Sequence, residues 1–245
     1  MKIIVHGAAG RMGREVMRLI SAEGSNNTLA AAVDAYGEGD MLTSLDLFSG
    51  EADCIIDFSN HTATPALLEY AKKRGIAVII ATTGHTKEEL DGIKAASESI
   101  PVFFSANMSL GVALLCNLAK TAAAAFPDAD IEIIEKHHNR KLDVPSGTAL
   151  MLADSVREAR PEAEYLIGRH AYGKRTKEEI GIHSLRLGNV VGEHEVIIST
   201  DTQIITLKHE AQSRSLFAEG AISAAEFLCG KGAGLYQMKD IVSNK

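Results

Sequence analysis

The sequence predicts an α/β fold: a doubly wound parallel sheet, followed by a second α+β domain with a mixed or antiparallel sheet. Two observations predict the first part. Its short apolar runs lack the alternation of half-buried strands, and stretches with helical character separate them. Crossovers between parallel strands are right-handed, so helices should cover both faces. A third observation predicts the second part, because its later strands follow one another without helices between them.

The first hundred residues alternate strand and helix signals. We expect strands at residues 2–6, 29–34, 53–57, 76–81 and 101–105. We expect a glycine-rich turn at residues 7–13 and helices at 14–22, 62–75 and 87–98. Ligands of such sheets bind beyond the carboxyl ends of the strands. The small and polar residues that gather at those ends are therefore candidate binding residues.

The turn after the first strand has the composition of a dinucleotide-binding loop. Gly7, Gly10 and Gly13 permit a sharp turn and a close approach to a pyrophosphate, although their spacing departs from the usual GxGxxG. The following helix offers free N–H groups and its positive dipole end, and Arg11 adds charge. Asp34 ends the second strand, where it would accept hydrogen bonds from the adenosine ribose. A purely structural turn is the alternative.

The residues after Asp34 bear on the form of the nucleotide. A basic side chain there would favour a 2′-phosphate, but the next four residues are Ala35-Tyr36-Gly37-Glu38. An acid at position 34 also repels a 2′-phosphate. The expected cofactors are therefore NADH, NADPH or both, with NADH used at least as well as NADPH.

The pattern changes from about residue 109. We expect helices at 110–125 and 147–159, and strands at 130–135, 180–186, 190–199 and 203–210. A last helix, at about 217–228, is expected to pack with the tail on the first domain. The chain should thus divide into a dinucleotide-binding domain, residues 1–108 and 216–245, and a second domain, residues 109–215.

The densest chemistry lies between Glu135 and Ala149, where basic side chains cluster in a chain of formal net charge −7. Pro145 disfavours helix in the residue before it, and Ser146 suits the N-cap of the helix that follows. That helix start suits a carboxylate, and the nearby histidines and lysine supply positive charge and a transferable proton. Simpler interpretations are a solvated basic surface and an ordinary helix cap.

Composition excludes several classes of function. The 25 Lys and Arg against 32 Asp and Glu argue against a nucleic-acid partner, and the absence of Trp argues against base stacking. No run approaches the ~20 apolar residues of a membrane span, and no signal peptide is recognisable. Cys54, Cys116 and Cys229 show neither metal nor disulfide spacing, which favours buried inert thiols in a reducing cytoplasm. No metal site is expected, since the adjacent histidines lack a third ligand.

Several segments together resemble the dihydrodipicolinate reductase (4-hydroxy-tetrahydrodipicolinate reductase) family. The resemblance is carried by residues 7–13, by Ala81-Thr82-Thr83-Gly84 and by residues 135–149, with further matches at 168–170, 181–186 and 191–195. It covers nearly the whole chain. The His-His…Lys…Pro-Ser-Gly-Thr segment is highly specific, whereas the glycine loop alone would not be.

The resemblance implies a reaction and a set of residues for it. A reduced nicotinamide would deliver hydride to a cyclic unsaturated dicarboxylate, giving tetrahydrodipicolinate in lysine biosynthesis. His137 and Lys141 take the acid–base positions, with Lys141 as the direct proton donor. The substrate positions, with Ser146 added from the helix start, are His138, Ser146, Gly147 and Thr148. The cofactor positions, with Gly7 added from the glycine turn, are Gly7, Ala8, Ala9, Gly10, Arg11, Met12, Gly13, Asp34, Ala81, Thr82, Thr83, Ser105, Ala106, Asn107 and Met108.

The family also implies a homotetramer built through the sheet of the second domain, which would make residues 109–215 a substrate-binding and oligomerisation domain. The chain departs from the family at Ala35, where Arg is common, and at Ser105 and Met108. Two other readings compete with this one. The first is another two-domain NAD(P) dehydrogenase acting on an amino dicarboxylate, and the second is a noncatalytic nucleotide-sensing protein.

Overall fold

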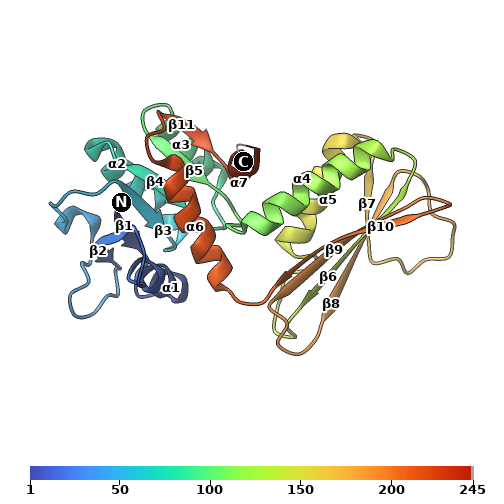
Figure 1. The fold of residues 1–245 in the computed structure, drawn as a ribbon, viewed down its shortest axis with the longest axis horizontal. Coiled ribbons are helices and arrows are strands. Elements are labelled where there is room, and N and C mark those ends of the chain that lie inside the picture. Colours follow the sequence, from blue (N-terminus) through green and yellow to red (C-terminus); the bar gives the residue numbers. More distant parts are fainter. Residues whose placement is uncertain (244–245) are drawn as a thin grey trace. The chain divides into compact units, whose positions relative to one another are not determined.

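The computed structural model describes residues 1–243, which form two compact units (Figure 1). The first unit contains Met1–Leu110 and the chain from Ser215 onward, and the second contains Gly111–Arg214. No helix of residues 1–243 is long and apolar enough to cross a membrane.

The first unit is built on a six-stranded parallel sheet. Its strands, in spatial order, are β11 (Gly234–Tyr236), β5 (Pro101–Phe104), β4 (Ala77–Ile80), β3 (Cys54–Asp57), β1 (Lys2–His6) and β2 (Thr28–Val33). The chain leaves β1 for β2 on one side and returns to β3 on the other. This reversal puts the topological switch point, where such sheets bind ligands, between the carboxyl ends of β1 and β3.

Helices cover both faces of this sheet (Figure 1). The first face carries α1 (Arg11–Ile20) and α6 (Ser215–Leu228), and the second carries α2 (Thr64–Arg74) and α3 (Lys87–Ser97). Because both faces are covered, β1, β3 and β4 bury apolar side chains in both directions, which explains the absence of alternation in their sequences. A short helix, α7 (Met238–Ser243), ends the described chain.

The second unit has a five-stranded mixed sheet. Its strands, in spatial order, are β10 (Ile204–Ala211), β9 (Gly192–Ser199), β6 (Asp130–His137), β8 (Glu179–Arg186) and β7 (Glu164–Ile167). β9 is antiparallel to β6 and β10, whereas β6, β8 and β7 run parallel. The core lies between one face of the sheet and two helices, α4 (Leu110–Ala125) and α5 (Gly147–Ala159). In β6 every second residue is buried, so Glu135 and His137 lie on the core face.

The predicted fold class is confirmed, with differences at particular elements. The expected turn at 7–13 is shorter, because α1 begins at Arg11 and takes Arg11, Met12 and Gly13 into its first turn. β6 continues to His137, two residues beyond the expected end, and α6 begins two residues early. Four short elements were not expected: a 3-10 helix at Leu45–Leu47, β7, β11 and α7.

Candidate active site

The turn between β1 and α1 depends on glycine at two positions. Gly7 has a φ of +79°, and a Cβ there would lie 2.6 Å from the backbone nitrogen of Ser59. A Cβ on Gly13 would lie 2.1 Å from the carbonyl oxygen of Gly7, so α1 can pack on the loop only without that carbon. Gly10 is the N-cap of α1 and supplies no side chain to its first N–H groups. The helix start therefore offers backbone donors to an anion.

Asp34 braces this turn. One of its carboxylate oxygens accepts a hydrogen bond from the Ala9 nitrogen at 3.0 Å, and the other accepts one from the Tyr36 nitrogen at 2.9 Å. Each carboxylate oxygen retains a further lone pair for a ligand hydroxyl. A cavity of about 520 Å³ lies beside it, lined by His6, Gly7, Gly10, Asp34, Ala35, Tyr36, Phe58, Ser59, Asn60, Thr62 and Ala63. The cavity brings together three predicted cofactor residues, Gly7, Gly10 and Asp34.

Asp57 joins the ends of three strands at the switch point. Its side chain is fully buried and accepts hydrogen bonds from Ser59 Oγ at 2.6 Å and Thr82 Oγ1 at 3.4 Å. His6 Nδ1 lies 2.8 Å from Asp57 Oδ1. Sequence reasoning included Thr82 among the cofactor residues and Asp57 only as a polar residue at a strand end, and it missed His6. The available signal for these two residues was that each is a polar residue at the end of an apolar strand, and that the two strands, β1 and β3, are neighbours.

Seven further predicted cofactor residues, 81–83 and 105–108, follow β4 and β5, and none of them lines the 520 Å³ cavity. Ser105 Oγ donates to the Asn107 carbonyl oxygen at 2.6 Å, so this hydroxyl shapes its own loop. Met108 is buried, and a Cβ on Gly220 of α6 would come within 1.7 Å of its carbonyl oxygen. Thr83 and Ala106 are exposed. In these segments, the buried side chains of Ser105 and Met108 hold the loops in place, whereas Thr83 and Ala106 are accessible to a ligand.

The chemistry of the second unit centres on Glu135, which is fully buried near the end of β6. Arg186 of β8 donates to both carboxylate oxygens, each at 2.8 Å, and the Ser146 nitrogen donates at 3.2 Å. His137 Nδ1 is hydrogen-bonded to the same carboxylate. Burial by itself would raise the pKa of Glu135, but the hydrogen bonds from His137 and Arg186 outweigh it and hold that pKa well below its usual value.

This arrangement orients His137. Because the ionised carboxylate only accepts hydrogen bonds, Nδ1 of His137 carries a hydrogen. Nε2 is then the end of the ring that can exchange a proton with a ligand. A Cβ on Gly192 would lie 3.1 Å from that Nε2, so the glycine keeps a space beside the ring. Glu135 thus fixes both the tautomer and the direction of the imidazole.

His194 of β9 lies against His137, with ring centroids 5.1 Å apart. Its Nε2 is 3.1 Å from Ser146 Oγ, which also accepts from the Ala149 nitrogen at 3.2 Å as the N-cap of α5. Burial, together with the nearby His137, lowers the pKa of His194 to about 4. The sequence predicted a strand at 190–199 and assigned no role to His194. That interpretation missed the alternation with Val196 and Ile198, which turns His194 toward the core.

The loop between β6 and α5 carries a group of positive charges. Lys141 Nζ lies 2.9 Å from Asp143 Oδ1, and the Lys141 nitrogen donates to the His138 carbonyl oxygen at 3.2 Å. The pKa of His138 is lowered by partial burial and by the charges of Arg140 and Arg214, with smaller effects from His137 and Lys141. Sequence reasoning did not select Arg214. The positive charges of several side chains are therefore concentrated around His138, beside the predicted acid–base residues.

The start of α5 lies in the same unit as these charges. Ser146 is its N-cap, and Gly147 is exposed, with no atom within 4 Å of the position that a Cβ would occupy. Thr148 is half-buried. The open space beside Gly147 lets a ligand approach the first backbone N–H groups of the helix. Within residues 1–243, no three His, Cys, Asp or Glu side chains are grouped as metal ligands.

Comparisons with known proteins give a consistent result. The sequence matches the family descriptions "Dihydrodipicolinate reductase, N-terminus" over residues 1–108 and "Dihydrodipicolinate reductase, C-terminus" over residues 111–242. It is 47% identical to the 4-hydroxy-tetrahydrodipicolinate reductase of Caldanaerobacter subterraneus subsp. tengcongensis, over 99% of this chain and 98% of that protein. The corresponding protein of Clostridium novyi is 41% identical, over 100% and 99%.

A solved structure is similar over the same extent. Dipicolinate-bound dihydrodipicolinate reductase from Paenisporosarcina sp. TG-14 superposes with a TM-score of 0.79 at 26% sequence identity. The superposition covers 98% of this chain and 99% of that chain. Similarity thus extends across both units, including the glycine loop and the Glu135 region.

Proposed function

The chain belongs to the dihydrodipicolinate reductase family, and from that premise we propose that it reduces 4-hydroxy-tetrahydrodipicolinate to tetrahydrodipicolinate. It is an NAD(P)H-dependent oxidoreductase of lysine and diaminopimelate biosynthesis. The observation that supports this most strongly is the Glu135–Arg186–His137 array near the open start of α5, in a chain that also has a nucleotide-type glycine loop.

The second unit supplies groups suited to a dicarboxylate. The cations around His138 attract an anion, and the N–H groups at Gly147 and Thr148 can receive a carboxylate. Ser146 already uses its nitrogen on Glu135 and its hydroxyl on His194 and Ala149. We therefore assign His138, Gly147 and Thr148 to substrate contacts. Ser146 would hold the carboxylate-binding end of α5 in place.

Lys141 is the proposed proton donor. Its ammonium pairs with Asp143 at 2.9 Å, and a dianionic substrate would be attracted to the same positive charge. A reduced nicotinamide, bound at the glycine loop, supplies the hydride. The 4-hydroxyl group of the substrate would leave with a proton as water. Lys141 would protonate a carbon of the resulting unsaturated ring as the hydride arrives, so no free carbanion-like species is formed. His137, oriented by Glu135, is placed to assist through Nε2.

The first unit fits the nucleotide part of the cofactor. Its loop has no room for a Cβ at Gly7 or Gly13, and no side chain caps the first N–H groups of α1. We propose that residues 7–13 receive the pyrophosphate and that Asp34 receives the ribose hydroxyls. Residues 81–83 and 105–108 would contact the nicotinamide end.

The same loop bears on cofactor choice. Asp34 borders the cavity and no basic residue follows it before residue 39, so NADH should serve at least as well as NADPH. Steady-state kinetics with both nucleotides test this point. A hundredfold preference for NADPH would overturn it.

We also propose a cytoplasmic homotetramer assembled through the sheet of the second unit. The face opposite α4 and α5 carries polar side chains that pair with one another, such as Lys136 with Glu193 and Lys208 with Glu193. Because these charges have partners within the face, an interface over it would bury ion pairs and not isolated charges. Light scattering of the eluted protein measures the mass directly. A monomer at working concentration would exclude this assembly.

One assay tests the activity. Purified protein is mixed with NADH or NADPH and freshly generated pathway substrate, and the loss of nicotinamide absorbance is followed. Substrate-dependent oxidation is expected. Nucleotide binding without turnover would instead indicate a nucleotide-sensing protein. Reduction of NAD⁺ by an amino dicarboxylate would indicate a different dehydrogenase.

A further inference from the structure

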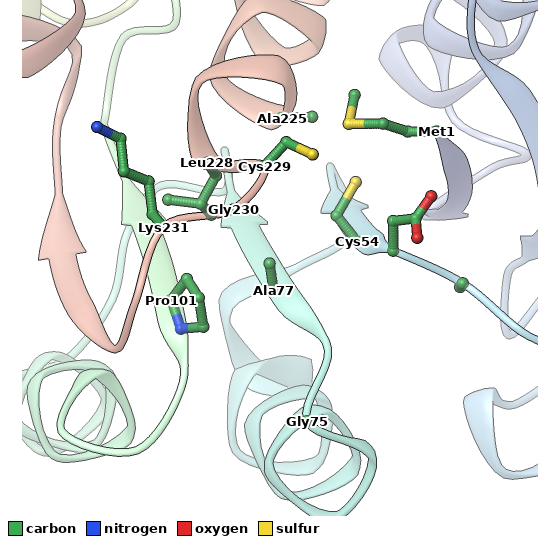
Figure 2. A pocket seen from close by; sticks show the side chains of 12 residues that line it. Met1, Cys54, Gly75, Ala77, Pro101, Ala225, Leu228, Cys229, Gly230 and Lys231 are labelled. Atoms are coloured by element: carbon green, nitrogen blue, oxygen red, sulfur yellow. The ribbon is translucent and has the colours of Figure 1, made fainter.

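A second cavity lies at the amino-terminal ends of the strands in the first unit's sheet, opposite the carboxyl ends that face the glycine loop. It has a volume of about 320 Å³, and its lining includes Cys54, Ala77 and Pro101, which begin β3, β4 and β5. The segment that follows α6 closes it with Cys229 and Lys231 (Figure 2). We propose that this cavity binds a soft metal ion such as Cu(I), held by the thiolates of Cys54 and Cys229 and by the thioether of Met1.

Sheet register explains why the two thiols meet. Cys54 lies beside Ile3 of β1 and Ala77 of β4, on the face opposite the core that α2 and α3 cover. α6 packs on β3, β4 and β5 from that side, and Cys229 follows its last residue. The Cys229 nitrogen donates to the Ala225 carbonyl oxygen at 3.1 Å, which anchors the end of the helix. The thiols therefore come from two firmly placed elements.

Met1 brings the third sulfur. Its ammonium donates to the Asn26 carbonyl oxygen at 3.0 Å, and its own carbonyl oxygen accepts from the Thr28 nitrogen at 2.8 Å. These bonds fix the backbone of Met1 beside β2. Figure 2 shows the sulfur atoms of Met1, Cys54 and Cys229 directed toward one another from three separate segments.

The chemistry of these groups suits a soft ion. Cys54 is only 2% exposed, and neither its thiol nor that of Cys229 has a hydrogen-bond partner within residues 1–243. Thiolate and thioether ligands select Cu(I) over hard cations. Asp53, the one carboxylate in the lining, already accepts from the Lys2 nitrogen at 2.6 Å.

The binding step balances without a redox change. Each cysteine loses its thiol proton to solvent as a sulfur–metal bond forms, so one Cu(I) displaces two protons and leaves a complex of net charge −1. Lys231, whose Nζ lies 4.7 Å from the centre of the Phe227 ring, also lines the cavity. Figure 2 shows this side chain directed away from the three sulfur atoms, so its ammonium does not contact the bis-thiolate complex.

The test uses the full chain with an unextended N-terminus. Cu(I) is titrated anaerobically into the protein in competition with a chromogenic Cu(I) chelator. The natural chain should withhold one equivalent of Cu(I) from the chelator, and the Cys229→Ser variant should withhold none. Cys229 is exposed, so serine there leaves the fold intact. The matched control is Cys116→Ser, which removes the cysteine of the second unit and should still bind one equivalent.

Two further measurements separate this site from binding by a single thiol. Cu(I) should raise the Tm of the natural chain and of Cys116→Ser but not that of Cys229→Ser, because a ligand stabilises only the state that binds it. Adding residues before Met1 should weaken binding by displacing the thioether. Equal Cu(I) retention by Cys229→Ser, or unchanged affinity in Cys54→Ala, would overturn the proposal. None of these readouts requires turnover, so they stand apart from the proposed reductase activity.

Discussion

The two candidate binding regions are built by opposite means. In the first unit the binding surface is backbone, because Gly7 and Gly13 have no room for a Cβ and Gly10 caps α1 without a side chain. In the second unit the surface is an interlocked set of side chains around Glu135, which is held by Arg186 and His137. A backbone site depends on local conformation. A side-chain site depends on sheet register and on charge.

This difference predicts different sensitivities. Substitution in the glycine loop should act through sterics and weaken nucleotide binding at every pH. Substitution around Glu135 should act through charge and hydrogen bonding, so its effects should appear in turnover and in pH dependence. Substitutions in the second region should therefore reduce turnover most at the proposed proton donor and least at residues that do not contact the substrate.

The largest effect is expected for Lys141→Ala. Removal of the proposed proton donor should lower kcat on the order of 10²- to 10⁴-fold, the range of general acid catalysis, while NADH affinity is unchanged. Steady-state kinetics and a direct nucleotide-binding titration measure the two quantities. Turnover that survives this substitution would remove Lys141 from the chemistry.

Glu135→Gln and His137→Ala should each lower kcat on the order of 10²-fold, because the carboxylate acts through the imidazole that it orients. The double variant should lose little more than either single one, since the two residues form one unit. Glu158→Gln, at an exposed pair with Lys120, is the control and should leave kcat unchanged. If the double variant instead lost kcat by the product of the two single losses, Glu135 would not act through His137.

Gly147→Val should raise KM for the dicarboxylate about tenfold, the equivalent of one lost charged hydrogen bond. The space beside Gly147 is open, so valine fits the fold and occupies only the approach to the helix start. Unfolding by denaturant should show a stability near that of the natural chain. A loss located in NADH affinity instead would reject the placement of the substrate at α5.

His194→Gln is expected to have the smallest effect on turnover at neutral pH. Its main effect should be on how the free energy of unfolding depends on pH. The folded-state pKa of His194 is lowered from 6.5 to about 4, so the unfolded chain takes up its proton first as pH falls. Stability should therefore decline from about pH 6.5 and level off below about pH 4, by at most about 3 kcal/mol from this group. Urea unfolding at several pH values should show a flatter profile in the variant. An identical profile would contradict the assignment.

Local sequence was sufficient for most of the first unit. Its five main strands are continuous apolar runs, and the glycine loop is recognisable from residues that are close together in the chain. β11 was missed because its three residues become a strand only by pairing with Pro101–Phe103 of β5. β7 is likewise short and depends on its distant partner, β8.

The second site was less accessible from the sequence. Its basic segment at 135–149 was identified, but Arg186 and His194 reach Glu135 only through pairing of β6 with β8 and β9. That register is a long-range property. Alternation within β9 was the one local signal for His194, and the flanking glutamates obscured it. Arg214 lies at the end of the second unit, where no motif pointed to its proximity to His138.

The first unit is discontinuous in the chain, and this has a consequence for its synthesis. Leu110 leaves the ribosome with β1 to β5 complete, but α6 and β11 follow only after the whole second unit. Until then the face formed by residues such as Ile79 and Phe103 lacks α6, whose Phe227 contacts Phe103 in the finished structure. The second unit, which is continuous, can fold in the meantime. The nascent chain therefore carries an uncovered apolar sheet for roughly a hundred residues of translation, a period when chaperone binding or aggregation competes with folding.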